Sequence, residues 1–396
     1  MNSASIPAPA PRHGRVEVAD VLRGLSVMGI LLLHSIEHFN FSSYPDTAGQ
    51  SPWLSFSDRA VWDGLFFLLG GKAYAIFALL FGFSFFIQDD NERMRGRDFR
   101  GRFCWRLVLL FLIGNLNAAF FTAEILVMYS LVGFVLVTAC RASDRAVGWL
   151  ALVCLLQPVA LYHAGRAALD ASYLTPAVPT REWWGAAYAV QSAGTFWQTV
   201  KVNLWEGQLA SLGWAWDHGR IFQTAGLFLL GMLAGRRGWL LERSLPLWGR
   251  VLAGALVAFF PLYGLDNMLP RFIDNANLLA PLRIVTSSLA NFSFMLVLVS
   301  GVLFAYYRSR GLCGAMRRLV PYGRTSLTNY VTQSVVGSLI FYNWGLGMHA
   351  RLGITASAAL GAGLFLLQYL FCRRWMRTHG HGPLEWLWKR ATWIGR

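Results

Sequence analysis

The stretch VADVLRGLSVMGILLLHSIEH, residues 18–38, is apolar over most of its length but contains Asp20, Arg23, His34, Glu37 and His38. About 20 apolar residues are enough for a helix to cross the hydrocarbon core of a bilayer. The stretch therefore predicts a membrane-spanning helix. Ionisable residues inside such a helix are costly, so each of these is a functional candidate.

The rest of the 396-residue chain repeats the apolar pattern. It is 55% hydrophobic and only 14% charged, whereas a soluble globular chain carries roughly 25% charged residues. The predicted fold class is all-α, a polytopic helical membrane protein with about ten transmembrane helices. The predicted spans are approximately 18–38, 66–88, 104–122, 124–140, 146–163, 219–236, 248–264, 283–306, 322–345 and 352–372.

The net charge of +15 lies in short clusters between the apolar stretches. A basic domain can indicate a nucleic-acid partner, but this placement is typical of a membrane topology signal, so no nucleic-acid partner is expected. If the ten spans alternate in direction, 24 lysines and arginines fall on one side of the membrane and eight on the other. The positive-inside rule then places both termini in the cytoplasm.

The predicted organisation is a disordered cytoplasmic tail at 1–17 followed by a single transmembrane domain at 18–372. Two outside segments, at about 39–65 and 164–218, are too long to be simple turns. The second is rich in tryptophan, which suits helices lying in the membrane interface. Gly70-Gly71 predicts a break before the second span. The five cysteines show no metal or redox spacing and none faces the outside, so disulfides are not expected.

Two pairs in the first span have helical spacing. Asp20 and Arg23 are three residues apart, as are His34 and Glu37, so each pair can touch on a helix. Arg23 and His34 share a face about 16 Å apart along the axis. A guanidinium binds phosphate oxygens in a bidentate manner, and an imidazole can act as a general base. We therefore interpret Arg23 as a binding residue for a phosphate-bearing donor, with His34 and Glu37 as the catalytic pair.

A structural interpretation of the same residues stays open. Asp20 and Arg23 would simply pair at the membrane edge, and His34 would make a hydrogen bond between helices. A third interpretation is a zinc site, because His34-Ser-Ile-Glu37-His38 matches the H-x-x-E-H pattern of inverted zinc peptidases. No third protein ligand is evident in the sequence, so no metal is expected.

Other polar groups lie within the apolar stretches, and the main ones are Lys72, Glu124, Arg324, Asn329 and Gln333. Amides such as Asn329 and Gln333, four apart on one face, commonly hold helices together. Lys72 and Arg324 could assist Arg23 in holding phosphates, although Lys72 could also extend its ammonium to the interface. Glu124 is charged and stands at a predicted hairpin.

Several separated motifs resemble the YeiB-like family, also called domain of unknown function 418. The region 323–396 carries the most specific ones, Gly323-Arg324-Thr-Ser-Leu-Thr-Asn329 and Gly382-Pro383-Leu384-Glu385-Trp386. The resemblance extends over nearly the whole chain through Asp20-Val-Leu-Arg23-Gly24, Gly71-Lys72, Leu80-Phe81-Gly82 and Glu124-Ile125-Leu126. It implies a protein with several spans in the bacterial inner (plasma) membrane.

Two positions depart from the family pattern, which usually has Asp in place of Glu124 and commonly Asn in place of His34. With His34 present, Arg23 and His34 reproduce the R-x10-H arrangement of acyltransferase-3 proteins, to which the YeiB-like family is similar, as it is to the lysosomal heparan-α-glucosaminide acetyltransferase. That similarity implies acetyl-CoA or another acyl-CoA as cytoplasmic co-substrate and no bound cofactor. A histidine that other members lack cannot be the catalytic group of the whole family.

The first functional hypothesis is therefore a membrane acyltransferase that acts on an extracytoplasmic glycan or lipid-linked acceptor. The alternative is a transporter or lipid-handling protein whose buried polar groups line a solute path. A purely structural role is a third hypothesis. The expected partners are the lipid bilayer, the acceptor and, as a further option, a second copy of the chain in a homodimer.

Overall fold

The computed structural model describes residues 15–41, 50–170, 172–176 and 178–394, and this part of the chain forms helices without a β-strand. Most of the predicted N-terminal tail lies outside the described residues. The helices are α1 (Glu17–Ile36), α2 (Pro52–Leu69), α3 (Ala73–Arg93), α4 (Arg100–Ala118), α5 (Leu126–Val132), α6 (Phe134–Ala139), α7 (Asp144–Leu155), α8 (Pro158–Leu169), α9 (Thr180–Ala193), α10 (Phe196–Val202), α11 (Gln208–Asp217), α12 (Arg220–Arg237), α13 (Leu245–Met268), α14 (Ala276–Arg308), α15 (Arg310–Arg317), α16 (Val320–Arg324), α17 (Ser326–Phe341), α18 (Ile354–Trp375) and α19 (Pro383–Thr392).

Five helical segments in the described chain are long and apolar enough to cross a membrane, and α7 with α8 makes a sixth if this pair, bent by 49°, is one span. Outer helices also expose large apolar side chains, including Val257, Phe260 and Leu367, which a soluble surface rarely gathers. The chain is thus a helical membrane protein. Each of the ten predicted stretches overlies a helix or two successive helices. However, α4 and α12 carry terminal arginines and α17 is short, so the number ten stays a prediction.

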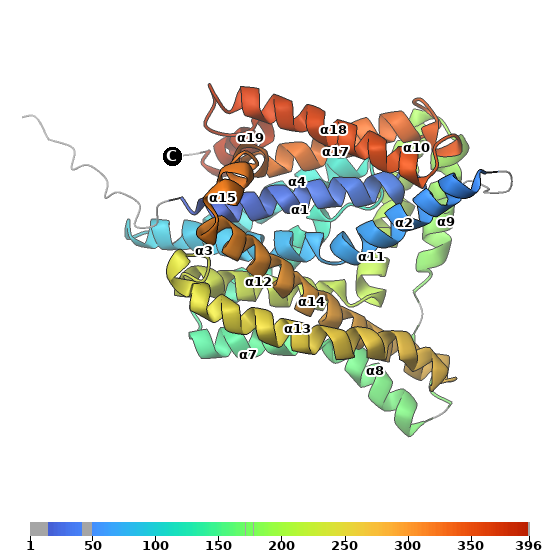
Figure 1. Ribbon diagram of the computed structural model, residues 1–396, viewed down its shortest axis with the longest axis horizontal. Helices are drawn as coiled ribbons and strands as arrows, with labels where there is room; N and C mark the ends of the chain where they lie inside the picture. Colours follow the sequence, from blue (N-terminus) through green and yellow to red (C-terminus); the bar gives the residue numbers. More distant parts are fainter. Residues whose placement is uncertain (1–14, 42–49, 171, 177, 395–396) are drawn as a thin grey trace, which may run out of the picture.

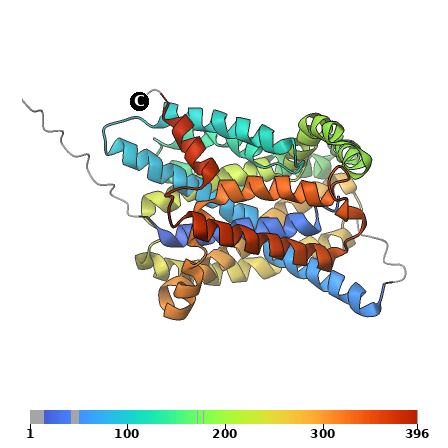
Figure 2. The same cartoon turned by 90° about the horizontal axis from the view of Figure 1, so that it is seen from above.

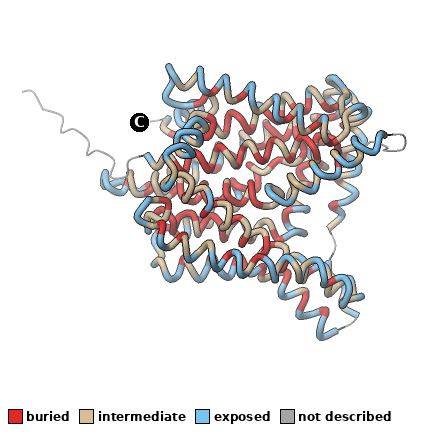
Figure 3. The backbone as a smooth tube through the Cα atoms, in the orientation of Figure 1, coloured by how far each residue is buried: buried red, intermediate tan, exposed pale blue. Residues whose placement is uncertain are grey.

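The long helices run side by side with α1 near the centre of the bundle (Figures 1 and 2). Helix α1 packs against α3, α16, α17 and α18, while α12 packs against α3 and α7, and α13 pairs with α14. Buried residues concentrate on the central helices, and exposed residues face outward along the peripheral ones (Figure 3). The centre of the bundle is therefore where polar side chains are shielded from the surroundings.

Glycines let α3 and α12 approach each other closely. A Cβ atom at Gly231 of α12 would overlap the carbonyl of Leu79, and one at Gly82 of α3 would overlap the backbone of Phe228. Small residues at such crossings allow backbone-to-backbone contact, which stabilises helix pairs in membranes. The pair α3–α12 consequently forms a fixed wall beside α1.

We expect Gly231→Ala to destabilise the protein, because the added methyl group meets backbone atoms that cannot rotate away. Overpacking of this kind costs about 1–3 kcal/mol. The matched control is Gly254→Ala in α13, where an added Cβ meets no atom within 4 Å. Thermal unfolding in nanodiscs should show a lower midpoint for Gly231→Ala than for the unmodified protein. The control should have the same midpoint as the unmodified protein. Equal midpoints for the two variants would contradict the close crossing.

The predicted break at Gly70-Gly71 is present. Helix α2 ends at Leu69, Gly71 has a φ of 73°, and α3 begins at Ala73. Such a φ is readily adopted only by glycine. Helix α2 itself begins at Pro52, so part of the predicted outside segment at 39–65 is helical. Residues 42–49 of that segment lie outside the described residues.

One end of the bundle gathers most of the basic residues, and we call it the basic end. It contains the start of α1, the end of α3, the start of α4, the loop before α7 and the helices α15 and α19, on the left of Figure 1. Several arginines are paired there: Arg141 Nη1 lies 2.8 Å from Asp89 Oδ2, and Arg317 Nη2 lies 2.6 Å from Glu17 Oε2. Pairing reduces repulsion but leaves this end strongly positive.

Helix α19 is held in place at the basic end by Glu385. One carboxylate oxygen of Glu385 accepts hydrogen bonds from the backbone N–H groups of Leu327 (2.7 Å) and Thr328 (3.1 Å), and the other accepts from the Thr328 hydroxyl (2.6 Å). These N–H groups belong to the first turn of α17, where they have no acceptor within the helix. A carboxylate there also interacts favourably with the helix dipole. The tail is thereby fixed against the bundle.

Candidate functional site

A cavity of about 220 Å³ lies between α1, α3, α4, α5, α16, α17 and α19. Three arginines from distant parts of the sequence line it: Arg23, Arg106 and Arg324, so we call it the arginine cavity. A second hollow of about 450 Å³ shares Gln88 and Trp388, among other residues, with its wall. The two hollows are thus neighbours, and both lie at the basic end.

Arg23 has one carboxylate partner, which it shares. Its Nη1 donates to Asp20 Oδ1 at 2.7 Å, while Arg15 Nε donates to Asp20 Oδ2 at 2.6 Å. Its Nη2 donates to the hydroxyl of Ser84 at 2.9 Å. The predicted helical pair of Asp20 and Arg23 is confirmed. Because Asp20 is divided between two arginines, the group as a whole stays cationic where it meets the cavity.

Arg106 and Arg324 have no carboxylate within 4 Å among the described residues. The guanidinium of Arg106 lies over the ring of Trp388 at 4.0 Å, and its Nε has no hydrogen-bond partner. Arg324 Nη2 donates to the carbonyl oxygen of Gly380 at 2.6 Å. Guanidinium groups that have no carboxylate partner and border the same cavity are suited to binding phosphate or carboxylate oxygens. The expected proximity of Arg324 to Arg23 is present, and Arg106 is an additional residue.

Lys72 lies away from the arginine cavity. Its ammonium group is 3.5 Å from the carbonyl oxygen of Phe66 and 5.6 Å from the ring centre of Phe294. Ser84, which contacts Arg23, is twelve residues further along α3, about 18 Å along a helix. The structure therefore does not bring Lys72 together with Arg23, because Lys72 precedes α3 at the opposite end from the arginine cavity.

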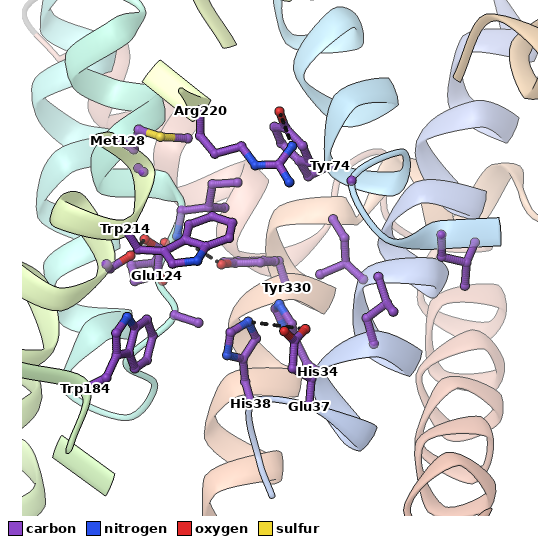
Figure 4. Close-up of a pocket in the computed structure, with 18 residues that line it drawn as sticks. His34, Glu37, His38, Tyr74, Glu124, Met128, Trp184, Trp214, Arg220 and Tyr330 are labelled. Atoms are coloured by element: carbon purple, nitrogen blue, oxygen red, sulfur yellow. Dashed lines mark hydrogen bonds and ion pairs between the residues drawn. The ribbon is translucent and has the colours of Figure 1, made fainter. Parts of the chain in front are cut away.

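A separate cavity of about 150 Å³ lies further from the basic end than the arginine cavity (Figure 4). We call it the histidine cavity. It is bordered by α1, α3, α9, α11, α12, α17 and the turn between α4 and α5. The ionisable residues lining it, apart from tyrosines, are His34, Glu37, His38, Glu124 and Arg220.

His34 projects into this cavity next to aromatic rings. Its ring centre lies 4.7 Å from that of Phe121 and 6.3 Å from that of Tyr330. Its Nδ1 atom is buried and has no hydrogen-bond partner among the described residues. The structure thus gives His34 no helix-to-helix hydrogen bond through Nδ1.

Glu37 lies beside His38 instead of His34. The Nε2 atom of His38 is 3.7 Å from Glu37 Oε2, and no contact between Glu37 and His34 is present in the described structure. Glu37 directly follows α1, and its backbone N–H still donates to the carbonyl oxygen of Leu33 at 2.9 Å. Its φ of −111° differs from the helical value near −63°, so its side chain leaves the backbone in a different direction from that of a residue within the helix. The expected contact of His34 with Glu37 is therefore wrong. The ring centre of His38 also lies 5.5 Å from that of His34.

Glu124 is buried and lies between α4 and α5. Its carboxylate accepts hydrogen bonds from the side chain of Asn117 and the backbone N–H of Leu126. Asn117 also donates to the hydroxyl of Ser334 on α17 at 3.1 Å. Glu124 thus lines the histidine cavity while it links three elements of the bundle.

We expect Glu124→Ala to destabilise the protein by about 1–3 kcal/mol, because it leaves buried donors on Asn117 and Leu126 without an acceptor. Thermal unfolding in nanodiscs measures the effect. Glu182→Ala, an exposed glutamate on α9, is the control and should leave the midpoint unchanged. An unchanged midpoint for Glu124→Ala would argue against this linking role.

Asn329 and Gln333 line neither cavity. Asn329 donates to the carbonyl oxygen of Tyr322 at 3.0 Å and accepts from the Cys372 thiol at 3.2 Å, so it joins α16, α17 and α18 as amides in membrane helices commonly do. Gln333 is fully buried, and neither polar atom of its amide has a partner in the described part of the chain. The structure offers no reason for that unpaired amide.

The two cavities have no lining residue in common, and Phe77, Leu126 and Tyr129 form the side of the arginine cavity nearest the histidine cavity in sequence; we call these three residues the dividing layer. These residues face the arginine cavity, whereas the neighbouring Tyr74 and Met128 face the histidine cavity. Tyr129 is fully buried, and its hydroxyl donates to the backbone oxygen of Tyr74 at 3.0 Å. Arg23 and His34 therefore reach opposite cavities from the same helix.

Within the described ranges, no group of three or more His, Cys, Asp or Glu is arranged to hold a metal ion. The H-x-x-E-H stretch at 34–38 accordingly has no third ligand there.

Comparison with known proteins relates the chain to a family. The family "Protein of unknown function (DUF418)" matches residues 234–395. The chain thus resembles the YeiB-like DUF418 family. It is 26% identical to the uncharacterized protein YxaH of Bacillus subtilis (strain 168), over 98% of this chain and 96% of that protein, and 27% identical to the uncharacterized protein YeiB of Escherichia coli (strain K12), over 94% and 95%. No solved structure matches.

The resemblance to the YeiB-like family is thus confirmed, and it extends beyond the matched region because both relatives align over nearly the whole chain. A third relative, an uncharacterized 39.9 kDa protein from Bacillus acidopullulyticus, is 22% identical over 97% of this chain. The names of these DUF418 relatives state no activity. The similarity to acyltransferases is not shown by these matches and stays a prediction.

Proposed function

We propose that this protein is a bacterial inner-membrane acyltransferase that moves an acyl group from cytoplasmic acyl-CoA to an extracytoplasmic glycan or lipid-linked acceptor. One observation carries the proposal: α1 presents Arg23 to a cationic cavity at the basic end and His34 to the histidine cavity, which lies beyond the dividing layer. A donor and an acceptor that approach from opposite sides need such an arrangement.

The proposed topology has ten spans with both termini in the cytoplasm. It is supported by the helices that overlie each predicted stretch and by the gathering of basic residues at one end of the bundle. The positive-inside rule assigns that end to the cytoplasm. The arginine cavity then faces the cytoplasm, where acyl-CoA is available, and the histidine cavity lies toward the outside.

Arg23, Arg106 and Arg324 would hold the phosphates of the donor. A guanidinium is suited to this task because its planar fork binds phosphate oxygens in pairs. The thioester at the far end of the donor would pass the dividing layer to reach the histidine cavity. That layer must therefore open or shift when the donor binds.

His34 would act as the general base. It takes the proton of an acceptor hydroxyl or amine, whose oxygen or nitrogen attacks the thioester carbonyl carbon. A new bond forms from that atom to the acyl carbon, the carbon–sulfur bond breaks, and CoA leaves as a thiolate that is then protonated. Glu37 would assist through His38, which lies near both Glu37 and His34.

We expect His34→Ala to lower acyl transfer by about 10²–10⁴-fold, the usual contribution of a general base. The measurement uses the full chain in nanodiscs, radiolabelled acetyl-CoA and a bacterial envelope extract as acceptor. The variant should still bind acetyl-CoA, since the phosphates contact the arginine cavity. His379→Ala, an exposed histidine at the basic end, is the control and should keep full activity. Absence of both transfer and CoA binding in the unmodified protein would reject the proposal.

A transporter or lipid-handling protein is the second candidate, and a specific observation favours it. Two cavities on opposite sides of the dividing layer also suit a path that opens alternately to each side. Flux of a solute into proteoliposomes without acyl transfer would support this candidate over the enzyme.

The proposed topology predicts which side chains can be labelled from outside. In a protein whose five native cysteines are replaced, Ser172→Cys should react with a membrane-impermeant maleimide in intact cells. Thr378→Cys should react only after the membrane is permeabilised. Both positions are exposed and lie at opposite ends of the bundle. Labelling of both from outside would contradict the assignment of the basic end to the cytoplasm.

A further inference from the structure

Arg220 opens α12 and lines the histidine cavity, far from the arginines of the basic end. Two aromatic rings flank its guanidinium, with Tyr74 at 4.8 Å and Trp214 at 5.4 Å. Its Nη1 donates to the Tyr74 hydroxyl at 3.1 Å and to Gln223 Oε1 at 2.8 Å. Its Nε atom is buried and unpartnered. The group is therefore fixed in position with part of its bonding capacity unused.

Arg220 has no carboxylate partner within 4 Å in the described part of the chain, and all of its hydrogen-bond acceptors are neutral. The two carboxylates of the same cavity are committed elsewhere: Glu124 accepts from Asn117 and Leu126, and Glu37 lies beside His38. A cation shielded from bulk water without a counter-charge is costly. An anionic ligand that enters the cavity would remove this cost and supply the missing acceptors.

The remaining walls of the cavity suit a ring. Trp214 lies next to Arg220 and stacks on His218 at 4.7 Å, so the edge of its indole is the part that borders the cavity. Trp184 stacks on His38 at 5.8 Å with an interplanar angle of 20°. Flat apolar faces together with a few placed polar groups are typical of small-molecule sites, and the C–H face of a sugar ring packs against indole. The cavity of about 150 Å³ is comparable to one that accommodates benzene, so it has room for one ring-sized unit.

We propose that the histidine cavity binds a negatively charged sugar unit, a sugar phosphate or sugar acid, with its anionic group on Arg220 and its ring against Trp214. The role of this unit as acyl acceptor rests on the proposed function, because only then does a hydroxyl need to face His34. Binding itself does not depend on any transfer. The unit comes either from a free sugar or from the head of a lipid-linked glycan, and both share the same charged ring.

The test measures binding to the full chain in phosphatidylcholine nanodiscs by isothermal titration calorimetry. The probes are N-acetylglucosamine 1-phosphate, glucuronate and neutral N-acetylglucosamine. The two anionic probes should bind at least about tenfold more tightly than the neutral sugar, since a hydrogen bond to a charged group is worth a factor of this order. A polyprenyl-phosphate-linked sugar that binds more tightly than the free sugar phosphate would identify the lipid-linked source.

Variants identify the residue responsible. Arg220→Gln should lose the preference for the anionic probes, and Arg220→Lys should restore part of it because the charge returns. Arg181→Gln, an exposed arginine on α9, is the matched control and should bind like the unmodified protein. If Arg220→Gln does not fold, the probe series on the unmodified protein and on Arg220→Lys still decides the question.

Equal affinity for charged and neutral sugars, or unchanged anion preference in folded Arg220→Gln, would overturn the inference. The proposed acyl transfer is tested by a different measurement, the transfer of label from acetyl-CoA. Anionic sugars that bind through Arg220 in a protein without acyl transfer would support this inference and reject the enzyme. Acyl transfer to neutral acceptors with equal binding of all probes would support the enzyme and reject this inference.

Discussion

The high cost of placing a charge in a membrane interior is the constraint on which the arrangement around α1 depends. A charged side chain there must meet a partner, an aromatic face or a cavity. Arg23 satisfies the requirement through Asp20 and Ser84, and Glu124 through Asn117 and Leu126. The bundle is therefore organised by its polar groups as much as by its apolar surface, because these groups determine which faces of α1, α3 and α17 turn inward.

The same constraint explains how the C-terminal tail becomes part of the bundle. Glu385 lies in the tail, but its carboxylate satisfies the free N–H groups at the start of α17. Trp388, one turn later on α19, lies over Arg106 and donates from its indole nitrogen to the Arg106 carbonyl at 3.2 Å. Two motifs separated by more than fifty residues thus meet in one contact. That contact completes the wall of the arginine cavity, so the tail is structural for the cavity that it borders.

The sequence predicts the helices, because their hydropathy pattern extends over many residues. It does not predict the contacts of residues that follow the end of a helix, because these depend on the direction that the chain takes there. Hydropathy located helices at all ten stretches, and helical spacing correctly paired Asp20 with Arg23. The same spacing failed for His34 and Glu37 because α1 ends between them. From the sequence, Arg106 and Arg220 contribute only to the numbers of basic residues on the two sides of the membrane. Their proximity to Trp388 and Tyr74 is a tertiary contact, and the only sequence signal for it is that each arginine adjoins an apolar stretch.

The dividing layer decides between the chemistry of a transferase and that of a carrier. In a transferase only the thioester end of the donor must pass Phe77, Leu126 and Tyr129, while its phosphates stay on the arginines. In a carrier the whole solute must pass, so the layer must open far enough for the polar part as well. Tyr129 is tied to the α3 backbone through Tyr74, and α3 is in turn fixed to α12 by glycine contacts at Gly82 and Gly231. Because the backbones of α3 and α12 are held together, side chains of the dividing layer can rotate to admit the narrow thioester end of a donor more easily than the helices can move apart. This favours the transferase.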